Sequence, residues 1–311
     1  MAGDPLSPRL RVTLCGLVFS NPVIAASGTF GYGVEMAPIV PLRQLGGLVV
    51  KGLSREPMRG NPPPRLYETR AGMINSVGLQ NMGVRAFVLE KLPGLRGCGT
   101  RVVTNVFGYA VEDYAEVIRV LEDAEGVDAY ELNVSCPNTK HGGMFFSSDP
   151  RLLAEVVTAC VRAARRPVIV KLSPNVASIA PLARAAEDSG ASAISLVNTF
   201  LGLAIDARTR RPRLGAGYGG VSGPAIKPLA LRLVHEAARA VKIPVIGLGG
   251  ILTGEDAAEF LIAGAAAVQV GTATFADPCA PVRIAAELDE FCRAQGITNV
   301  SSLTGTLEMP G

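Results

Sequence analysis

Eight short runs of apolar residues recur along the chain, each followed by a turn rich in glycine or polar residues. The runs cover residues 23–27, 48–52, 101–107, 129–136, 168–173, 193–198, 244–249 and 267–272. They are apolar on both faces rather than alternating, which is typical of parallel β-strands covered by helices. The pattern therefore predicts eight buried parallel strands.

Segments with helical periodicity separate these runs. Asp149 is placed to cap a helix that starts at Pro150, and its apolar positions recur every three or four residues. A second helix is expected after Pro224, and a third after Thr253 as the capping residue. Regular βα alternation indicates a parallel sheet with right-handed crossovers. An open doubly wound sheet is an alternative, but the number of runs favours a (β/α)8 TIM barrel.

Two segments depart from the alternation. Residues 11–21 have the pattern of a β-hairpin that could form the floor of the barrel. Residues 55–83 show no clear helical period and contain Asn61-Pro62-Pro63-Pro64. A loop this long is usually functional or disordered, and it follows the second strand, on the face where barrel active sites lie. No linker is visible, so residues 1–311 are expected to form a single barrel domain.

Composition and charge exclude several classes of protein. The chain has 311 residues, of which 48% are hydrophobic and 18% charged, and this balance argues against intrinsic disorder. The net charge of +3 argues against nucleic acid or an anionic membrane as a partner. No signal peptide and no run of 18 apolar residues is visible, so a cytoplasmic protein that does not span a membrane is expected.

The cysteines and histidines do not suggest a metal site. The six cysteines form no C-x-x-C pair and there are only two histidines. Neither zinc nor an iron–sulfur cluster is therefore expected within this chain. Free thiols suit a reducing cytoplasm.

Polar residues concentrate where the predicted strands end, which is where barrel enzymes place their catalytic groups. Two of only six lysines, Lys51 and Lys171, lie there, each at the end of an apolar run. A lysine buried at such a place needs an ionic partner or a depressed pKa. The alternative is that one of the two extends to solvent.

Glycines follow the seventh and eighth runs, at Gly249-Gly250 and at Gly271-Thr272. This is the usual phosphate site of a barrel, because backbone amides without side chains can approach a phosphate closely. The alternative is that these glycines only turn the chain.

Cys136 stands at the mouth of the fourth strand, in Asn133-Val134-Ser135-Cys136-Pro137-Asn138. Buried cysteines are most often small apolar residues, an interpretation that suits Cys15 and Cys160. It suits Cys136 less well because its neighbours are polar. A thiolate favoured by nearby lysines could act there as a general base.

Several motifs together resemble a class 1 dihydroorotate dehydrogenase. They are ELNVSCPNTKHGGMFF, VKLSPN, LVNT, GGVSGPAIKPLALRLV, PVIGLGG and VQVGTATF, which occur in order at matching strand ends between Leu10 and Phe275. The continuation Lys140-His141-Gly142-Gly143 resembles the class 1B, NAD-linked catalytic subunit rather than the fumarate-dependent class 1A. Class 2 relatives carry serine in place of Cys136.

The resemblance implies the cofactor FMN, with no bound metal. The expected FMN contacts are Ser27, Lys51, Asn105, Asn133, Lys171, Val197, Gly223, Gly249, Gly250, Gly271 and Thr272. Lys171 would face the N1–O2 side of the flavin, where a fixed cation stabilises the anionic reduced form.

The resemblance also implies the substrate, dihydroorotate, and the product, orotate. The expected contacts are Lys51, Asn75, Ser76, Val77, Gly78, Leu79, Asn133, Asn138, Asn198 and Thr199. Cys136 would remove the C5 proton of dihydroorotate while the C6 hydrogen passes as hydride to FMN, a step of pyrimidine (UMP) biosynthesis. Electrons would then reach NAD through a separate subunit with FAD and a 2Fe-2S cluster, in a heterotetramer.

The sequence is also compatible with other interpretations. A class 1A, fumarate-linked dihydroorotate dehydrogenase is one, and the barrel domain of dihydropyrimidine dehydrogenase is another. A tRNA dihydrouridine synthase is a third, with Arg208, Arg210, Arg211 and Arg213 as an RNA contact. A phosphate-binding barrel without chemistry would leave Cys136 and the asparagines without a role.

Overall fold

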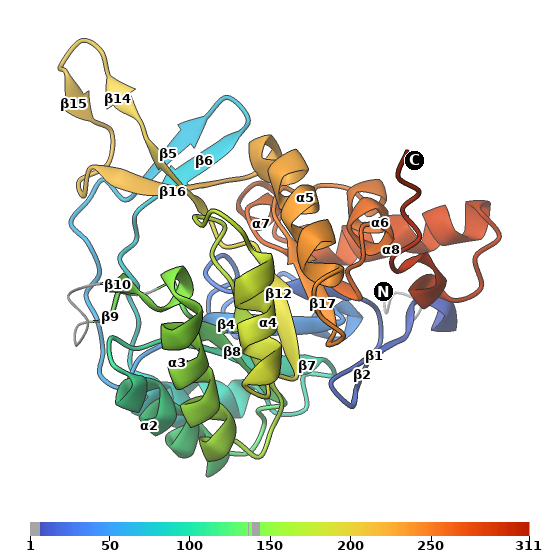
Figure 1. The fold of residues 1–311 in the computed structure, drawn as a ribbon, viewed down its shortest axis with the longest axis horizontal. Helices are drawn as coiled ribbons and strands as arrows, with labels where there is room; N and C mark the ends of the chain where they lie inside the picture. Colours follow the sequence, from blue (N-terminus) through green and yellow to red (C-terminus); the bar gives the residue numbers. More distant parts are fainter. Residues whose placement is uncertain (1–6, 136, 139–143, 311) are drawn as a thin grey trace.

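Eight of the described strands form a closed parallel barrel (Figure 1). The structure is a computed structural model, and it describes residues 7–135, 137–138 and 144–310. In barrel order the strands are β3 (Val23–Ala25), β4 (Gly47–Leu53), β7 (Arg101–Val106), β8 (Ala129–Asn133), β11 (Val168–Lys171), β12 (Ala193–Leu196), β17 (Val245–Leu248) and β18 (Ala267–Val270). Each overlaps one of the eight predicted runs, so the prediction of a (β/α)8 barrel is confirmed.

Helices lie between the barrel strands. They include α1 (Val84–Ala86), α2 (Val111–Glu122), α3 (Pro150–Ala163), α4 (Ala180–Asp188), α5 (Lys227–Ala238), α6 (Gly254–Ile262), α7 (Ala273–Ala276) and α8 (Ala280–Ala294). Asp149 caps α3 by accepting the Arg151 N–H at 2.7 Å, and Thr253 caps α6 in a capping box with Asp256. The helix expected after Pro224 begins with a 3-10 turn, Pro224–Ile226, and continues as α5.

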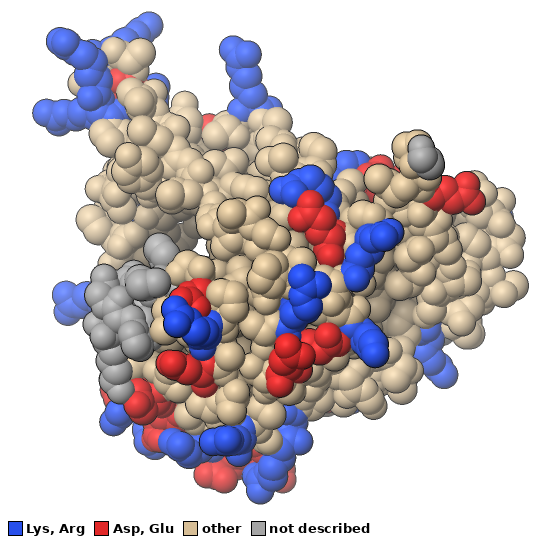
Figure 2. All heavy atoms as spheres, in the orientation of Figure 1, with Lys and Arg blue, Asp and Glu red and all other residues tan. Residues whose placement is uncertain are grey.

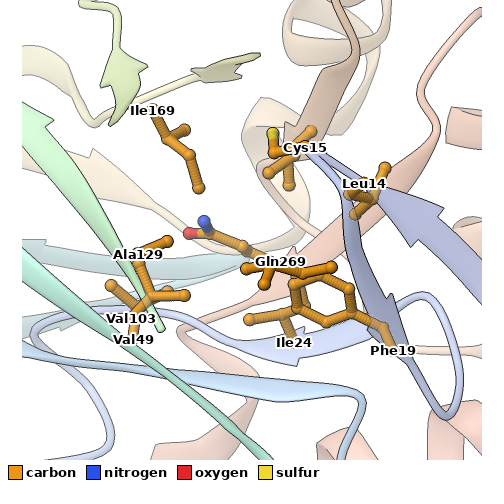
Figure 3. Close-up of a pocket in the computed structure, with 11 residues that line it drawn as sticks. Leu14, Cys15, Phe19, Ile24, Val49, Val103, Ala129, Ile169 and Gln269 are labelled. Atoms are coloured by element: carbon orange, nitrogen blue, oxygen red, sulfur yellow. The ribbon is translucent and has the colours of Figure 1, made fainter. Parts of the chain in front are cut away.

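A hairpin closes the end of the barrel opposite the strand C-termini. β1 (Val12–Leu14) pairs with β2 (Leu17–Phe19), which confirms the predicted floor. Between floor and barrel lies a cavity of about 10 Å³ whose lining is apolar except for Gln269 (Figure 3). Figure 3 shows the Gln269 amide among the side chains of Ala129 and Ile169.

The long segment after the second barrel strand contains regular structure that the sequence pattern did not predict. β5 (Leu66–Thr69) and β6 (Gly72–Asn75) form a hairpin inside it, and they join β16 (Tyr218–Ser222) and β13 (Phe200–Leu203) in one antiparallel sheet. The expected long excursion after the second strand is therefore confirmed, and it carries a hairpin that the absence of a helical period did not indicate. β5 is largely exposed, so it lacks the apolar alternation by which a strand is recognised.

Short strand pairs complete the described part of the chain. β14 (Ile205–Asp206) pairs with β15 (Arg211–Pro212) in a hairpin that projects from the molecule, and β9 (Pro137–Asn138) pairs with β10 (Met144–Phe145) (Figure 1). No helix in the described ranges is long and apolar enough to cross a bilayer.

Candidate functional site

A layer of buried polar side chains lies inside the barrel, below the strand ends. Glu131 has no solvent exposure, and its carboxylate accepts hydrogen bonds from Asn105 at 2.8 Å, Ser195 at 2.9 Å and Gln269 at 2.6 Å. Sequence reasoning selected only Asn105 from this group. The available signal for Glu131 was a carboxylate within the apolar run 129–136, and the signal for Ser195 and Gln269 was a polar residue within the runs 193–198 and 267–272.

A lysine buried at a strand end needs an ionic partner or a depressed pKa, and the two lysines at the strand ends each have one of these. Lys171 is 6% exposed, and its Nζ lies 3.6 Å from Glu131 Oε1. Lys51 is half-buried, and the pKa of its ammonium is lowered by burial and by the positive charge of Arg65. One lysine therefore has an ionic partner, while the other has a depressed pKa.

Three glycines from two chain segments meet beside the end of β18. Gly223, Gly249 and Gly250 all have positive φ, and a Cβ on Gly250 would lie 2.9 Å from the Gly223 carbonyl oxygen. Thr272 Oγ1 donates to Ser222 Oγ at 2.8 Å, which ties the turn after β18 to this group. Among the described residues, the N–H groups of Gly250 and Thr272 have no hydrogen-bond acceptor. The glycines therefore turn the chain and also leave donors for an anion.

A chain of contacts links the asparagines at the barrel mouth. Asn198 Nδ2 donates to Asn133 Oδ1 at 3.3 Å, and Asn198 Oδ1 accepts the Thr199 N–H at 2.8 Å. Thr199 packs against Gly220 of β16, where a Cβ would lie 2.0 Å from its Oγ1. Asn75 donates to the Gly220 carbonyl at 3.2 Å. The β16–β6 pairing thus brings Asn75, from the long segment, to the asparagines that follow the barrel strands.

Three further predicted residues lie at strand ends nearby. Ser27 Oγ donates to the Val50 carbonyl at 2.8 Å, immediately before Lys51. Val197 packs against Gly249, where a Cβ would lie 3.2 Å from the valine Cγ2. Gly271 accepts a hydrogen bond from Thr274 Oγ1 at 2.9 Å, which fixes the turn after β18.

Other predicted substrate residues make their contacts within the long segment. Asn61 binds the Ser76 hydroxyl at 2.7 Å and donates its backbone N–H to the Val77 carbonyl at 3.0 Å. Gly78 and Leu79 continue this turn with positive φ. In the described part of the chain, no hydrogen bond joins residues 76–79 to Asn133, Asn198 or Thr199. Asn138 is described only as part of β9, and Cys136 lies outside the described residues.

The arginine-rich segment is separate from the mouth. Figure 2 shows basic side chains gathered on the projecting β14–β15 hairpin, where Arg208, Arg210 and Arg211 are exposed. Arg213 pairs with Asp206 at 2.8 Å and stacks on the Tyr67 ring at 5.1 Å. Within the described residues, no group of three or more His, Cys, Asp or Glu side chains is arranged to bind a metal ion.

Comparison with known proteins identifies relatives over nearly the whole chain. A family model described as dihydroorotate dehydrogenase matches residues 9–292. A Solibacter usitatus protein provisionally named dihydroorotate dehydrogenase A (fumarate) is 69% identical, over 97% of this chain and 100% of its own length. Proteins from Geobacter metallireducens and Geobacter sulfurreducens, named dihydroorotate dehydrogenase B (NAD(+)) catalytic subunit, are 52% and 53% identical over 97% of this chain and 99% of their own.

Proposed function

The chain belongs to the dihydroorotate dehydrogenase family, and on that premise we propose that it oxidises (S)-dihydroorotate to orotate in pyrimidine biosynthesis. Members of this family are FMN-dependent flavoenzymes. The observation that carries the proposal is that the strand ends of one barrel hold a glycine cluster with free N–H groups, the buried Lys171, which is paired in the sheet with Asn133, and the linked asparagines.

The residues present fit FMN. The free N–H groups of Gly250 and Thr272 suit its phosphate, and the buried ammonium of Lys171 suits the electron-rich pyrimidine edge of the flavin. When bound, FMN supplies the acceptor for the hydride that leaves C6 of dihydroorotate. Its proposed contacts are Ser27, Lys51, Asn105, Asn133, Lys171, Val197, Gly223, Gly249, Gly250, Gly271 and Thr272.

The asparagine chain suits the substrate. Each carboxamide offers a donor and an acceptor, which matches the alternating edge of a pyrimidinedione. Asn133, Asn198 and Asn75 would orient the ring, with Thr199 packed behind it and Lys51 placed to attract the carboxylate. Asn138 and the turn 76–79 complete the proposed set.

Cys136 is the proposed base that removes the proton from C5. A C5 hydrogen next to a carbonyl is acidic enough for a thiolate, and the cationic side chains of Lys51 and Lys171, which also lie at strand ends, would favour the thiolate form. The Cys136→Ser variant is expected to lower turnover by about 10²-fold or more, because serine is a far weaker base, while FMN and orotate binding persist. Near-normal turnover at neutral pH would contradict this role.

We propose that the electrons pass to NAD through a partner subunit with FAD and a 2Fe-2S cluster, in a cytoplasmic heterotetramer of two copies of each chain. The names of the Geobacter relatives and the Lys140–Gly143 motif favour this acceptor. In this account residues 1–311 are a single barrel domain. Co-expression with a candidate partner should confer dihydroorotate-dependent NAD reduction, and full-rate NAD reduction by the single chain would contradict it.

A fumarate-linked enzyme is the second candidate, because the relative at 69% identity carries that name. The purified chain alone would then couple dihydroorotate oxidation to fumarate reduction. A comparison of fumarate with NAD, with and without the partner, separates the two acceptors.

A further inference from the structure

Glu131 is a fully buried carboxylate in the centre of the barrel. Branched apolar side chains ordinarily fill barrel interiors, and a buried ionised carboxylate loses several kcal/mol of hydration. Glu131 offsets this loss with three hydrogen bonds and one ionic contact, to side chains of four other barrel strands. Buried ion pairs of this kind add little to stability compared with apolar packing. Its presence therefore suggests a role beyond packing.

One oxygen of this carboxylate contacts two of the residues assigned to the flavin. Glu131 Oε1 accepts from Asn105 Nδ2 at 2.8 Å and lies 3.6 Å from Lys171 Nζ. Because Asn105 uses its NH2 group on Glu131, its carbonyl oxygen is directed elsewhere. At 3.6 Å the ammonium is an ionic neighbour rather than a close donor. Lys171 therefore keeps N–H groups for an acceptor at the barrel mouth.

We propose that Glu131 is a positioning residue for the flavin: it orients Asn105 and Lys171, and its negative charge lowers the reduction potential of bound FMN. The inference rests on the proposed function, since Lys171 serves the flavin only if the chain binds FMN. Lys171 stabilises the negative charge of reduced flavin, whereas Glu131 opposes it. Together they leave the layer with no net charge beside the flavin.

The buried polar layer can accommodate an uncharged glutamine in place of Glu131. Gln269 Nε2 donates to Glu131 Oε2 at 2.6 Å, while Gln269 Oε1 has no partner among the described residues. In a Glu131→Gln variant, reversal of the Gln269 carboxamide would present that oxygen to the new NH2 group. At the other oxygen, the hydrogen bond from Asn105 and the contact with Lys171 would persist. The variant is therefore expected to fold.

The test is the midpoint potential of bound FMN, measured anaerobically against a reference dye in wild type and in Glu131→Gln. Loss of the negative charge should shift the equilibrium towards reduced FMN by tenfold or more, which is about 30 mV more positive for a two-electron couple. An unchanged or more negative potential in a variant that retains FMN would overturn the inference.

Two further variants test whether the FMN potential responds to the charge of Glu131 or to a change in the structure of the protein. Glu122→Gln changes another buried carboxylate, which binds Arg165 and Arg166 away from the mouth, and should leave the potential unchanged. The double variant Glu131→Gln/Gln269→Glu keeps the same groups in the layer but moves the charge away from Lys171. It should also shift the potential positively, and a wild-type potential there would overturn the inference even if the single variant does not fold. Absence of FMN from the wild-type protein would instead contradict the proposed function.

Discussion

Asn75 and Gly220 are 145 residues apart in sequence, yet the Asn75 side chain donates a hydrogen bond to the Gly220 carbonyl at 3.2 Å. The two residues are also partners in the pairing of β6 with β16. This pairing holds the hairpin of the long segment beside Thr199, and so brings Asn75 close to Asn198 and Thr199, two other residues assigned to the substrate.

Asn75→Ala is expected to weaken orotate binding about tenfold or more, since it removes a side chain that would hydrogen-bond the ring. The dissociation constant can be measured from the perturbation of the flavin spectrum. FMN content should not change. Glu68→Ala, on the exposed neighbouring strand of the same hairpin, is the matched control. Equal affinities in wild type and Asn75→Ala would remove Asn75 from the site.

Gly250→Ala is expected to lower the affinity for FMN at least tenfold. Gly250 has φ +85°, and a Cβ there would lie 2.9 Å from the Gly223 carbonyl oxygen and 3.0 Å from the Lys227 backbone nitrogen. The turn must shift, and its free N–H shifts with it. Gly296→Ala provides the control, because Gly296 has φ +68° but open space around it. Both variants carry backbone strain of about 1–2 kcal/mol, so full FMN affinity in Gly250→Ala would contradict the phosphate assignment.

Asp256 should make stability depend on pH. Burial raises the pKa of its carboxyl, but hydrogen bonds from Lys227 and from the backbone N–H groups of Leu252 and Thr253 outweigh burial and hold the pKa below its usual value. A carboxyl group whose pKa is lower in the folded state than in the unfolded state stabilises the fold at pH values above its unfolded pKa, which is about 3.9 for Asp. This stabilisation is lost as the pH falls through the folded-state pKa.

The Asp256→Asn variant tests this dependence. It should reduce the free energy of unfolding at pH 7 by about 1–3 kcal/mol and flatten its decline below about pH 5. Urea unfolding at a series of pH values measures both effects. Glu290→Gln, in an exposed pair with Arg293, should change neither. If the free energy of unfolding of Asp256→Asn declined at acid pH as it does in wild type, groups other than Asp256 would control the decline.

The thiols of Cys15 and Cys160 should resist alkylation in the folded protein. Burial raises the pKa of Cys15 to about 11 and that of Cys160 to about 12, so both are neutral at pH 7.5. Brief treatment with iodoacetamide followed by peptide mass spectrometry should find Cys136 modified first, with orotate slowing its reaction. All three should react in denaturant. Modification of Cys15 as fast as Cys136 would contradict the assignment of the reactive thiol.

The barrel could be predicted because its strands are apolar on both faces, a property that is local in the sequence. The hairpin β5–β6 could not be predicted, because its partner β16 lies far along the chain and the residues of β5 are mostly exposed. The buried layer shows the same limit. The sequence indicated that a buried Lys171 needs a partner, but it did not identify Glu131 as that partner. Glu131 is held in place partly by Gln269, which is 138 residues away in sequence, and only closure of the barrel creates that contact.

The most direct test of the account is anaerobic mixing of the purified, FMN-loaded protein with dihydroorotate, followed by the absorbance of oxidised flavin. We expect rapid bleaching with dihydroorotate, no bleaching with dihydrouracil or with NADPH alone, and bleaching slowed about 10²-fold or more in Cys136→Ser. A flavin that stays oxidised with dihydroorotate, or that is reduced equally well by dihydrouracil, would contradict it.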